Sequence, residues 1–250
     1  MRKVDFLIIG AARSGTLSLH HMLRQHENVF LPVEPPEPNF FFKKSEYRKG
    51  IDYYHNRYFA GAEANKILGE KSTSYFYNSN KVAKRIFDYS RNMKLILLLR
   101  NPIERIISNY FFTLKNGIEI MDLDYAIQYE EQRKGNYIDK WKEIKPYDYI
   151  GRSKYYNELK EYLKYFGRDQ ILIILFDDFR KQPSKEVIRI CNFLNISQSP
   201  KIDYKQLNKG NYDIRISEKT LEKLKLKLYE DVYKLAELLE VDVVNMWKMN

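Results

Sequence analysis

Short apolar runs alternate along the chain with stretches in which apolar residues recur at helical spacing. The runs predict buried strands, and the spaced positions predict helices that bury one face. In chain order, the predicted strands are 6–9, 29–31, the start of 67–76, 94–99 and 171–176. The predicted helices follow residue 16 and then cover 102–114, 156–166, 184–194 and about 217–239. Strands alternating with helices indicate an α/β fold in which helices flank a central parallel sheet.

The chain length favours one domain over residues 1–250, because 250 residues suffice for one large core. Within it, the pattern of segment 115–151 loosens into polar and aromatic residues. We predict a variable helical lid or acceptor-binding region there. Segment 201–250 is predicted to hold a loop followed by the long last helix.

Local signals refine several of these elements. Pro102 suits the first turn of a helix, whose buried face is predicted to run from Ile103 to Leu114. Ser108 is expected on another side of that helix. Ser184 is predicted to cap the helix of 184–194, which contains Cys191. Cys191 is the only cysteine and lies among apolar positions, so it is predicted to be a core residue with no disulfide or metal role.

The first predicted strand runs directly into a glycine-bounded loop, Gly10-Ala11-Ala12-Arg13-Ser14-Gly15-Thr16. A loop that ends at a helix N-terminus directs backbone N–H groups and the positive end of the helix dipole toward an anion. The glycines have the G-x-x-x-x-G spacing of a P-loop, but Thr16 stands where an NTP-binding loop has lysine. We therefore predict a cradle for a phosphate-like group, with Arg13 as its cation. A tight turn without a ligand is the alternative.

A proline-rich loop is predicted after the second strand. Four of the eight prolines lie in 32–42, so the segment is stiff, extended and not helical. Glu34 and Glu37 are its candidate reactive groups, and exposed loop carboxylates are the alternative. The aromatic triplet 40–42 is predicted to anchor the loop in the core.

Two further basic residues stand at predicted strand ends, Lys71 after 67–70 and Arg100 after 94–99. Ligands of open α/β sheets bind at the carboxyl ends of the strands. The net charge of +10 likewise favours anionic ligands without choosing among them. No apolar run approaches the roughly 20 residues that span a bilayer, and the first strand lies too near Met1 for a signal peptide. We therefore expect a cytoplasmic protein.

Four motifs, IIGAARSGT, EPPEPNFF, GEKSTSYF and LLLRNPIERIISNY, occur in this order between about residues 6 and 110. Together they closely resemble the sulfotransferases that use 3′-phosphoadenosine 5′-phosphosulfate (PAPS), particularly the bacterial and heparan-sulfate-type carbohydrate branch. A looser likeness extends to about residue 194. The resemblance implies a P-loop-like sulfotransferase fold, a PAPS donor that leaves adenosine 3′,5′-bisphosphate, and no required metal.

The resemblance also implies roles for particular residues. Arg13, Ser14, Gly15, Thr16 and Leu17 fall on the loop that binds the 5′-phosphosulfate. Arg100 and Ser108 fall on the pair that binds the 3′-phosphate, and Lys209 belongs to a partial match of the C-terminal phosphate-contacting loop. Glu37 aligns with the general base, Lys71 with the catalytic lysine, and Arg13 is expected to assist in catalysis. Asn39 stands where the heparan-type enzymes have histidine.

Other interpretations remain open from the sequence. Glu34, or less readily His20 or His21, would replace Glu37 as the base. A P-loop nucleotide kinase or NTPase, and a polyanion-binding protein without activity, are the other functions. No nucleic-acid-binding module is recognisable. The acceptor is expected to be a glycan or another hydroxylated compound.

Overall fold

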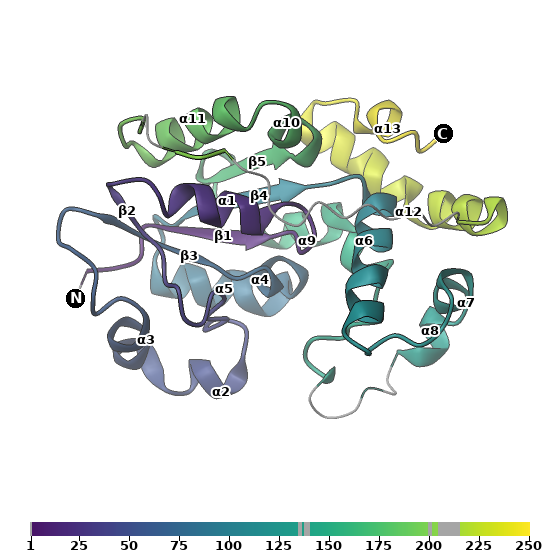
Figure 1. Cartoon of the computed structure of the whole chain (residues 1–250), viewed down its shortest axis with the longest axis horizontal. Coiled ribbons are helices and arrows are strands. Elements are labelled where there is room, and N and C mark those ends of the chain that lie inside the picture. Colours follow the sequence, from purple (N-terminus) through teal and green to yellow (C-terminus); the bar gives the residue numbers. More distant parts are fainter. Residues whose placement is uncertain (1, 135–136, 138–140, 200–201, 205–215) are drawn as a thin grey trace. The chain divides into compact units, whose positions relative to one another are not determined.

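The computed structural model describes residues 2–134, 137, 141–199, 202–204 and 216–250 (Figure 1). The chain forms two compact units, each made of two separate stretches. The first unit comprises Met1–Arg100 and Glu158–Lys209, and the second comprises Asn101–Asn157 and Gly210–Asn250.

The first unit contains the sheet. Its described strands are β1 (Phe6–Gly10), β2 (Val29–Phe30), β3 (Ile67–Lys71), β4 (Lys94–Leu99) and β5 (Ile171–Leu175). They are all parallel and lie in the order β2-β3-β1-β4-β5 (Figure 1). The predicted α/β class with a central parallel sheet is confirmed. β1, and β4 after its first residue Lys94, are continuous apolar runs because helices cover both faces of the sheet.

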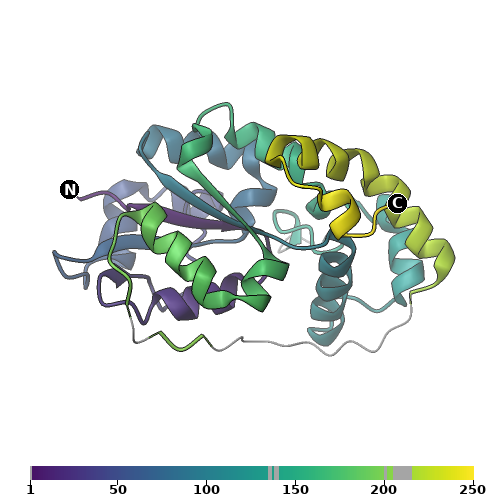
Figure 2. The same ribbon diagram turned by 90° about the horizontal axis from the view of Figure 1, so that it is seen from above.

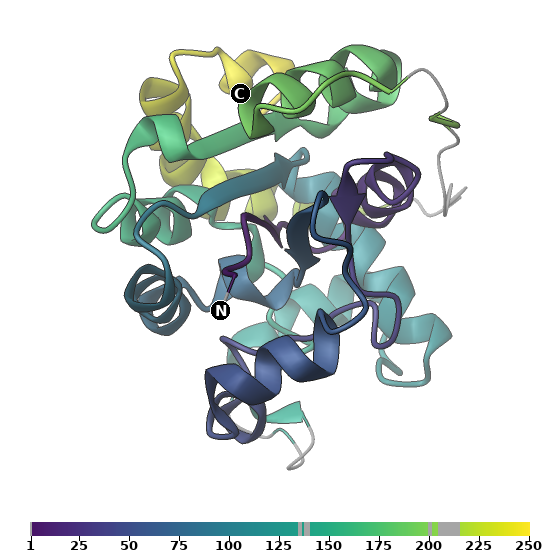
Figure 3. The same cartoon turned by 90° about the vertical axis from the view of Figure 1, so that its left-hand side faces the viewer.

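The helices of the first unit lie on both faces of this sheet. They are α1 (Thr16–Leu23), α2 (Lys44–Tyr47), α3 (Gly50–Tyr58), α4 (Ser74–Tyr77), α5 (Ser79–Tyr89), α10 (Phe176–Lys181) and α11 (Pro183–Leu194), with a 3₁₀ turn η3 (Arg168–Gln170). α1 and α11 lie on one face, and α4 and α5 lie on the other (Figures 2 and 3). α1 lies in the connection from β1 to β2, whereas α4 and α5 lie in the connection from β3 to β4, which crosses the sheet in the opposite direction. Right-handed crossovers of opposite direction place their helices on opposite faces.

The main core fills the space between α1, α11 and the sheet. Leu19 and Met22 of α1 and Ile190 of α11 pack there with alternate residues of β1 and β4. Cys191 is buried in the same cluster, as predicted. Each of these helices buries apolar residues at three- and four-residue spacing, so their faces are complementary to the pleated surface of the strands.

The second unit is helical in the part that the structure describes. Its elements are α6 (Pro102–Lys115), α7 (Leu123–Gln128), α8 (Glu130–Arg133), the 3₁₀ turn η2 (Gly151–Ser153), α12 (Glu218–Leu239) and α13 (Val243–Met246). α9 (Tyr155–Tyr162) begins in this unit and ends in the first. Asp231 of α12 accepts hydrogen bonds from the backbone N–H groups of Tyr156 and Asn157, at 3.0 and 3.2 Å. The N-terminus of α9 is therefore capped by a side chain from α12.

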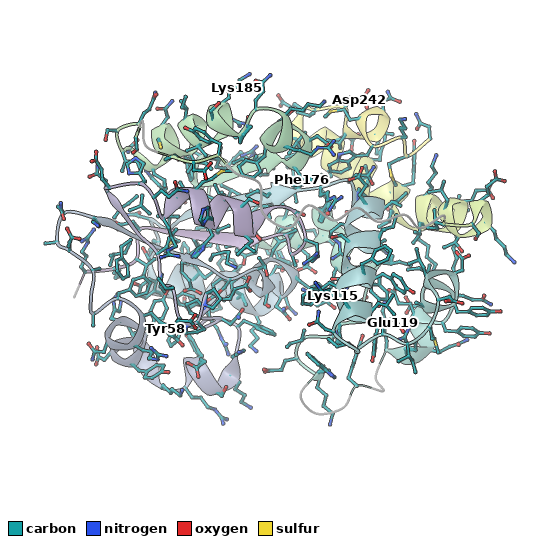
Figure 4. The ribbon with its side chains drawn as sticks, in the orientation of Figure 1. Tyr58, Lys115, Glu119, Phe176, Lys185 and Asp242 are labelled. Atoms are coloured by element: carbon teal, nitrogen blue, oxygen red, sulfur yellow. The ribbon has the colours of Figure 1, made fainter. Side chains whose placement is uncertain are left out.

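Buried charged groups organise the second unit. The Arg105 guanidinium is fully buried and donates to Ser153 Oγ at 2.6 Å and to the Tyr149 carbonyl at 2.7 Å. The Glu119 carboxylate is buried and pairs with Arg133 at 2.9 Å. Figure 4 labels Glu119 in the segment after α6. These hydrogen bonds compensate for the removal of the charges from water.

Several local predictions are confirmed and others are wrong. Asn101 caps α6 by accepting from the N–H groups of Ile103 and Glu104, and Pro102 follows in the first turn, as predicted. Ser217 caps α12 near the predicted start. Ser184 is not a cap, because α11 already begins at Pro183 and so contains Ser184.

The end of one strand and the buried side of one helix also differ from the predictions. The last strand ends at Leu175 because Phe176 starts α10. Leu114 is 40% exposed although it continues the apolar face of α6, whereas Ser108 is buried. The buried side of α6 is wider than its apolar stripe, since it also includes Arg105 and Asn109. Within the described ranges, every helix is too short or too polar to span a bilayer.

The packing of β1 against β3 yields a test of the sheet. Phe6 is paired with Gly69 and its ring is fully buried, and a Cβ at position 69 would overlap that ring. We expect Gly69→Ala to lower the free energy of unfolding by about 1–3 kcal/mol in a denaturant titration. Gly61→Ala is the control, because an added Cβ meets no atom there within 4 Å. Adding Phe6→Leu to Gly69→Ala should cost less than the two separate losses combined, and simple additivity would contradict the proposed overlap.

Candidate functional site

The glycine-bounded loop between β1 and α1 has the conformation of a helix-terminal cradle. Gly15 is the N-cap of α1 and has φ 87°, in the left-handed region that glycine adopts without strain. A Cβ at Gly15 would approach the Phe176 ring to 2.8 Å, so close packing also favours glycine. Figure 4 labels Phe176, which lies at the start of α10. Arg13 also has a positive φ, of 71°.

The side chains of this loop differ in exposure. Ser14 is fully buried, and its hydroxyl has no hydrogen-bond partner among the described residues. Thr16 is buried, whereas Leu17 is 39% exposed. A buried hydroxyl without a partner costs free energy, so Ser14 suits a loop that receives an anionic ligand.

Lys71 ends β3 next to this loop in the sheet. Its backbone pairs with Ile8 of β1, two residues before Gly10. The Lys71 side chain is only 4% exposed, and its Nζ donates to Glu37 Oε1 at 2.8 Å. A buried ammonium needs such a partner, and the pair unites the end of a strand with the proline-rich loop.

Glu37 has further partners at the end of β3. Its carboxylate accepts from the Thr73 backbone N–H at 3.3 Å and from Thr73 Oγ1 at 3.1 Å. The Glu37 side chain keeps 27% of its surface exposed, so it is held in position and still reaches solvent. Glu34 is exposed in the same loop. The structure thus brings Glu37 to Lys71.

Arg100 follows the last residue of β4, the strand that pairs with β1 on the side opposite to β3, and it contacts the glycine-bounded loop. Its Nη1 donates to the Arg13 carbonyl at 3.4 Å, and its guanidinium lies 4.9 Å from the centre of the Phe176 ring. The carboxyl ends of the parallel strands β1, β3 and β4 therefore carry three basic residues, Arg13, Lys71 and Arg100, on the same side of the sheet.

Two other predicted site residues do not belong to the described part of the first unit. Ser108 is on α6 in the second unit and is described with that unit, where it is buried. Lys209 lies outside the described residues. Among the described residues, no three His, Cys, Asp or Glu side chains are arranged to hold a metal ion.

The sequence prediction missed Thr73 and Glu70. Both belong to the motif GEKSTSYF, in which only Lys71 was assigned a role. Thr73 binds Glu37 through two groups, and Glu70 is fully buried with hydroxyl donors around its carboxylate. Their place beside Lys71 was the available signal.

The fold and the site together define a class of protein. It is an α/β protein with a P-loop-like anion cradle, basic residues at the carboxyl ends of its strands and a lysine–glutamate pair. The cradle lacks the lysine of NTP-binding loops. Residues 3–225 match the sulfotransferase domain. The chain belongs to the sulfotransferase family.

Individual proteins support this assignment. The chain is 30% identical over 192 residues to mouse heparan sulfate glucosamine 3-O-sulfotransferase 3A1, covering 77% of this chain and 46% of that one. A solved sulfotransferase from Alicyclobacillus acidocaldarius has 25% identity and a TM-score of 0.84, over 99% of this chain and 100% of that chain. Mouse sulfotransferase SULT7A1 complexed with PAP shares the fold, with 12% identity and a TM-score of 0.61 over 99% of this chain and 89% of that chain. The chain spans 23% to 59% of the length of the first three curated relatives that it matches.

His20 provides a test of burial beside the site. It is buried in α1, and burial, followed by the positive charges of Lys71 and Arg24, lowers its pKa to about 4. The unfolded chain therefore binds a proton first as pH falls from about 6.5, and folding stability is lost progressively toward pH 4. This shift corresponds to about 3 kcal/mol.

We expect His20→Gln to remove most of that pH-dependent loss in urea titrations between pH 6.5 and 4. His21→Gln alters the less buried neighbouring ring and is the matched control. A wild-type pH dependence retained in His20→Gln would contradict the assignment.

Proposed function

We propose that this protein transfers a sulfuryl group from PAPS to a hydroxyl or amine of an acceptor. The observation that carries the proposal is the 2.8 Å contact between Lys71 Nζ and Glu37 Oε1 at the sheet edge where the P-loop-like loop begins. This contact places a cation and a proton acceptor at the same carboxyl end of the sheet as the anion cradle. The family assignment supports the same reaction class.

The donor is proposed to bind with its 5′-phosphosulfate in the loop of Arg13, Ser14, Gly15, Thr16 and Leu17. The buried Ser14 hydroxyl fits this ligand, because a phosphate or sulfate oxygen would satisfy it. Arg100 is proposed to bind the 3′-phosphate, and Ser108 and Lys209 take the same role by family resemblance. The PAP complex of a protein with this fold supports a nucleotide of this kind.

The proposed reaction is a direct displacement at sulfur that uses only the donor, the acceptor and these side chains. The acceptor oxygen or nitrogen attacks sulfur in line, the bond between sulfur and the 5′-phosphate oxygen breaks, and adenosine 3′,5′-bisphosphate leaves with the bonding electrons. Glu37 takes the proton of the acceptor. Arg13 and Lys71 stabilise the negative charge that develops on the leaving phosphate.

The acceptor is proposed to be a carbohydrate, with segment 115–151 as the acceptor-binding region. The net charge of +10 favours an anionic glycan. Tyr125 and Tyr129 of this segment are exposed, and their rings stack at 6.2 Å with an interplanar angle of 5°, which suits contact with sugar rings. A relative named as a heparan sulfate sulfotransferase supports the same acceptor class.

Glu37→Gln tests the base. We expect transfer to slow by at least ~100-fold, because the amide cannot accept the acceptor's proton. Binding of adenosine 3′,5′-bisphosphate, measured by calorimetry, should remain unchanged. Glu34→Gln is the matched control from the same loop and should keep its turnover. Near-normal turnover of Glu37→Gln, or a comparable loss in Glu34→Gln, would remove Glu37 from the mechanism.

Arg100→Ala tests the 3′-phosphate contact. We expect the Kd of adenosine 3′,5′-bisphosphate to rise by roughly 10- to 100-fold, as for a lost hydrogen bond to a charged group. The affinity for 5′-AMP, which lacks the 3′-phosphate, should change little. Arg91→Ala, at the opposite end of β4, is the control for the loss of a positive charge. Equal weakening for both nucleotides would contradict the assignment.

Radiolabelled PAPS offered with a panel of glycans, lipids and phenols tests the reaction itself. Label transferred to one acceptor class in the presence of a chelator would support the proposal. Magnesium-dependent ATP consumption without sulfate transfer would identify a kinase or NTPase instead. Retention of sulfated glycans without either activity would identify a binding protein.

A further inference from the structure

Glu70 is a buried carboxylate for which the proposed reaction has no direct use. It is fully buried in β3, next to Lys71. Successive side chains of a strand point to opposite faces, so Glu70 and Lys71 leave the strand in opposite directions. Burial raises the pKa of Glu70, and its hydroxyl donors act in the other direction. A carboxylate in this position needs a structural or functional reason.

Three hydroxyl groups surround the Glu70 carboxylate. Ser72 Oγ and Tyr75 Oη each donate to Oε1 at 2.5 Å, and Tyr54 Oη donates to Oε2. Tyr54 and Tyr75 are fully buried, as is Ser72. The carboxylate therefore gathers donors from α3, from the turn after β3 and from α4.

Two of these hydroxyls also bind the proline-rich loop. Ser72 Oγ accepts from the Asn39 backbone N–H at 2.8 Å, and Tyr75 Oη accepts from the Phe41 backbone N–H at 3.1 Å. A hydroxyl has one proton, so each of these groups accepts from the loop and donates its own proton to Glu70. Glu70 thereby sets the direction of both chains of hydrogen bonds.

The anchored part of the loop directly follows Glu37. Asn39 Nδ2 donates to the Glu37 carbonyl at 3.1 Å. Phe40 and Phe41 are fully buried, and the Phe40 ring stacks on Tyr54 at 4.4 Å. The Arg85 guanidinium donates to the Phe41 carbonyl at 2.9 Å. The end of the loop is thus held against β3 and its neighbours, and only Pro38 separates Asn39 from Glu37.

We propose that Glu70 is a positioning residue that, through Ser72 and Tyr75, anchors the loop and so sets the Glu37 carboxylate against Lys71 and Thr73. This inference rests on the proposed role of Glu37 as the base. Two successive residues of β3 then have different roles. Lys71 pairs with Glu37 directly, and Glu70 holds the proline-rich loop through the Ser72 and Tyr75 hydroxyls. The proposal requires that loss of the Ser72 or Tyr75 hydroxyl disturb Glu37 more than loss of the Tyr54 hydroxyl.

The hydroxyls are removed one at a time, because Glu70→Ala would leave three buried donors without an acceptor and threaten the fold. Ser72→Ala and Tyr75→Phe each delete a hydroxyl that binds both Glu70 and the loop. Tyr54→Phe deletes one that binds Glu70, with no contact to the loop backbone among the hydrogen bonds described. It is the matched control, since all three variants remove one buried hydrogen bond to the same carboxylate.

Amide hydrogen exchange across residues 39–42 measures the anchoring without any assay of activity. We expect exchange to accelerate by at least ~10-fold in Ser72→Ala and Tyr75→Phe and to stay near the wild-type rate in Tyr54→Phe. Ser72→Thr, which restores a hydroxyl, should restore slow exchange. Equal rates in Ser72→Ala, Tyr75→Phe and Tyr54→Phe would overturn the anchoring.

Turnover and nucleotide binding then test the positioning. We expect kcat for sulfuryl transfer to fall by roughly 10- to 100-fold in Ser72→Ala and Tyr75→Phe, with the Kd of adenosine 3′,5′-bisphosphate unchanged. Tyr54→Phe should retain kcat even if its melting temperature falls. Faster loop exchange with normal kcat would overturn the positioning role. If the wild-type protein neither binds this nucleotide nor transfers sulfate, the proposed function fails, while the exchange rates still decide whether the Glu70-bound hydroxyls of Ser72 and Tyr75 anchor the loop.

Discussion

The ion pair between Lys71 and Glu37 is the interaction on which the candidate site depends. The two residues are 34 positions apart, and the 2.8 Å contact joins the end of β3 to a loop stiffened by prolines. Lys71 is nearly buried, so the pair offsets a desolvation cost that an unpaired ammonium would bear in full. Since β3 pairs with β1, the same contact relates Glu37 to the strand that leads into the glycine-bounded loop. The placement of the proposed base is therefore a property of the sheet as well as of its own loop.

The two units bury charge in different settings. In the first unit, Glu70 is buried, and three hydroxyl groups that donate to its carboxylate connect it to neighbouring segments. In the second, Arg105, Glu119 and Glu130 are buried within a small helical unit, and backbone groups supply many of their partners. Burial raises the pKa of Glu130 to about 7, while Lys134 and the Ile150 N–H act in the other direction.

Much of the first unit could be predicted from sequence, and less of the second. Residues 95–99 are an unbroken apolar run, and the structure has the strand 94–99 with both of its predicted ends. The segment 115–151 has a loosened hydrophobic pattern because periodicity detects only apolar burial. Glu119, Glu130 and Asp148 are buried there, and they look like surface positions in such a pattern. For the same reason, the apolar pattern of α6 predicts a buried side that is too narrow, because it omits Arg105.

The amino-acid order was enough to predict the parallel α/β class, the strand–loop–helix cradle and the basic residues at strand ends, because these depend on neighbours only a few positions apart. The three-dimensional packing was needed to see that Glu37 and not Glu34 pairs with Lys71, that Thr73 donates hydrogen bonds to Glu37, and that Glu70 is buried. These contacts join residues more than thirty positions apart or depend on which face of a strand becomes the core. No local pattern contains that information, because it arises when the loop, β3 and the aromatic cluster pack together.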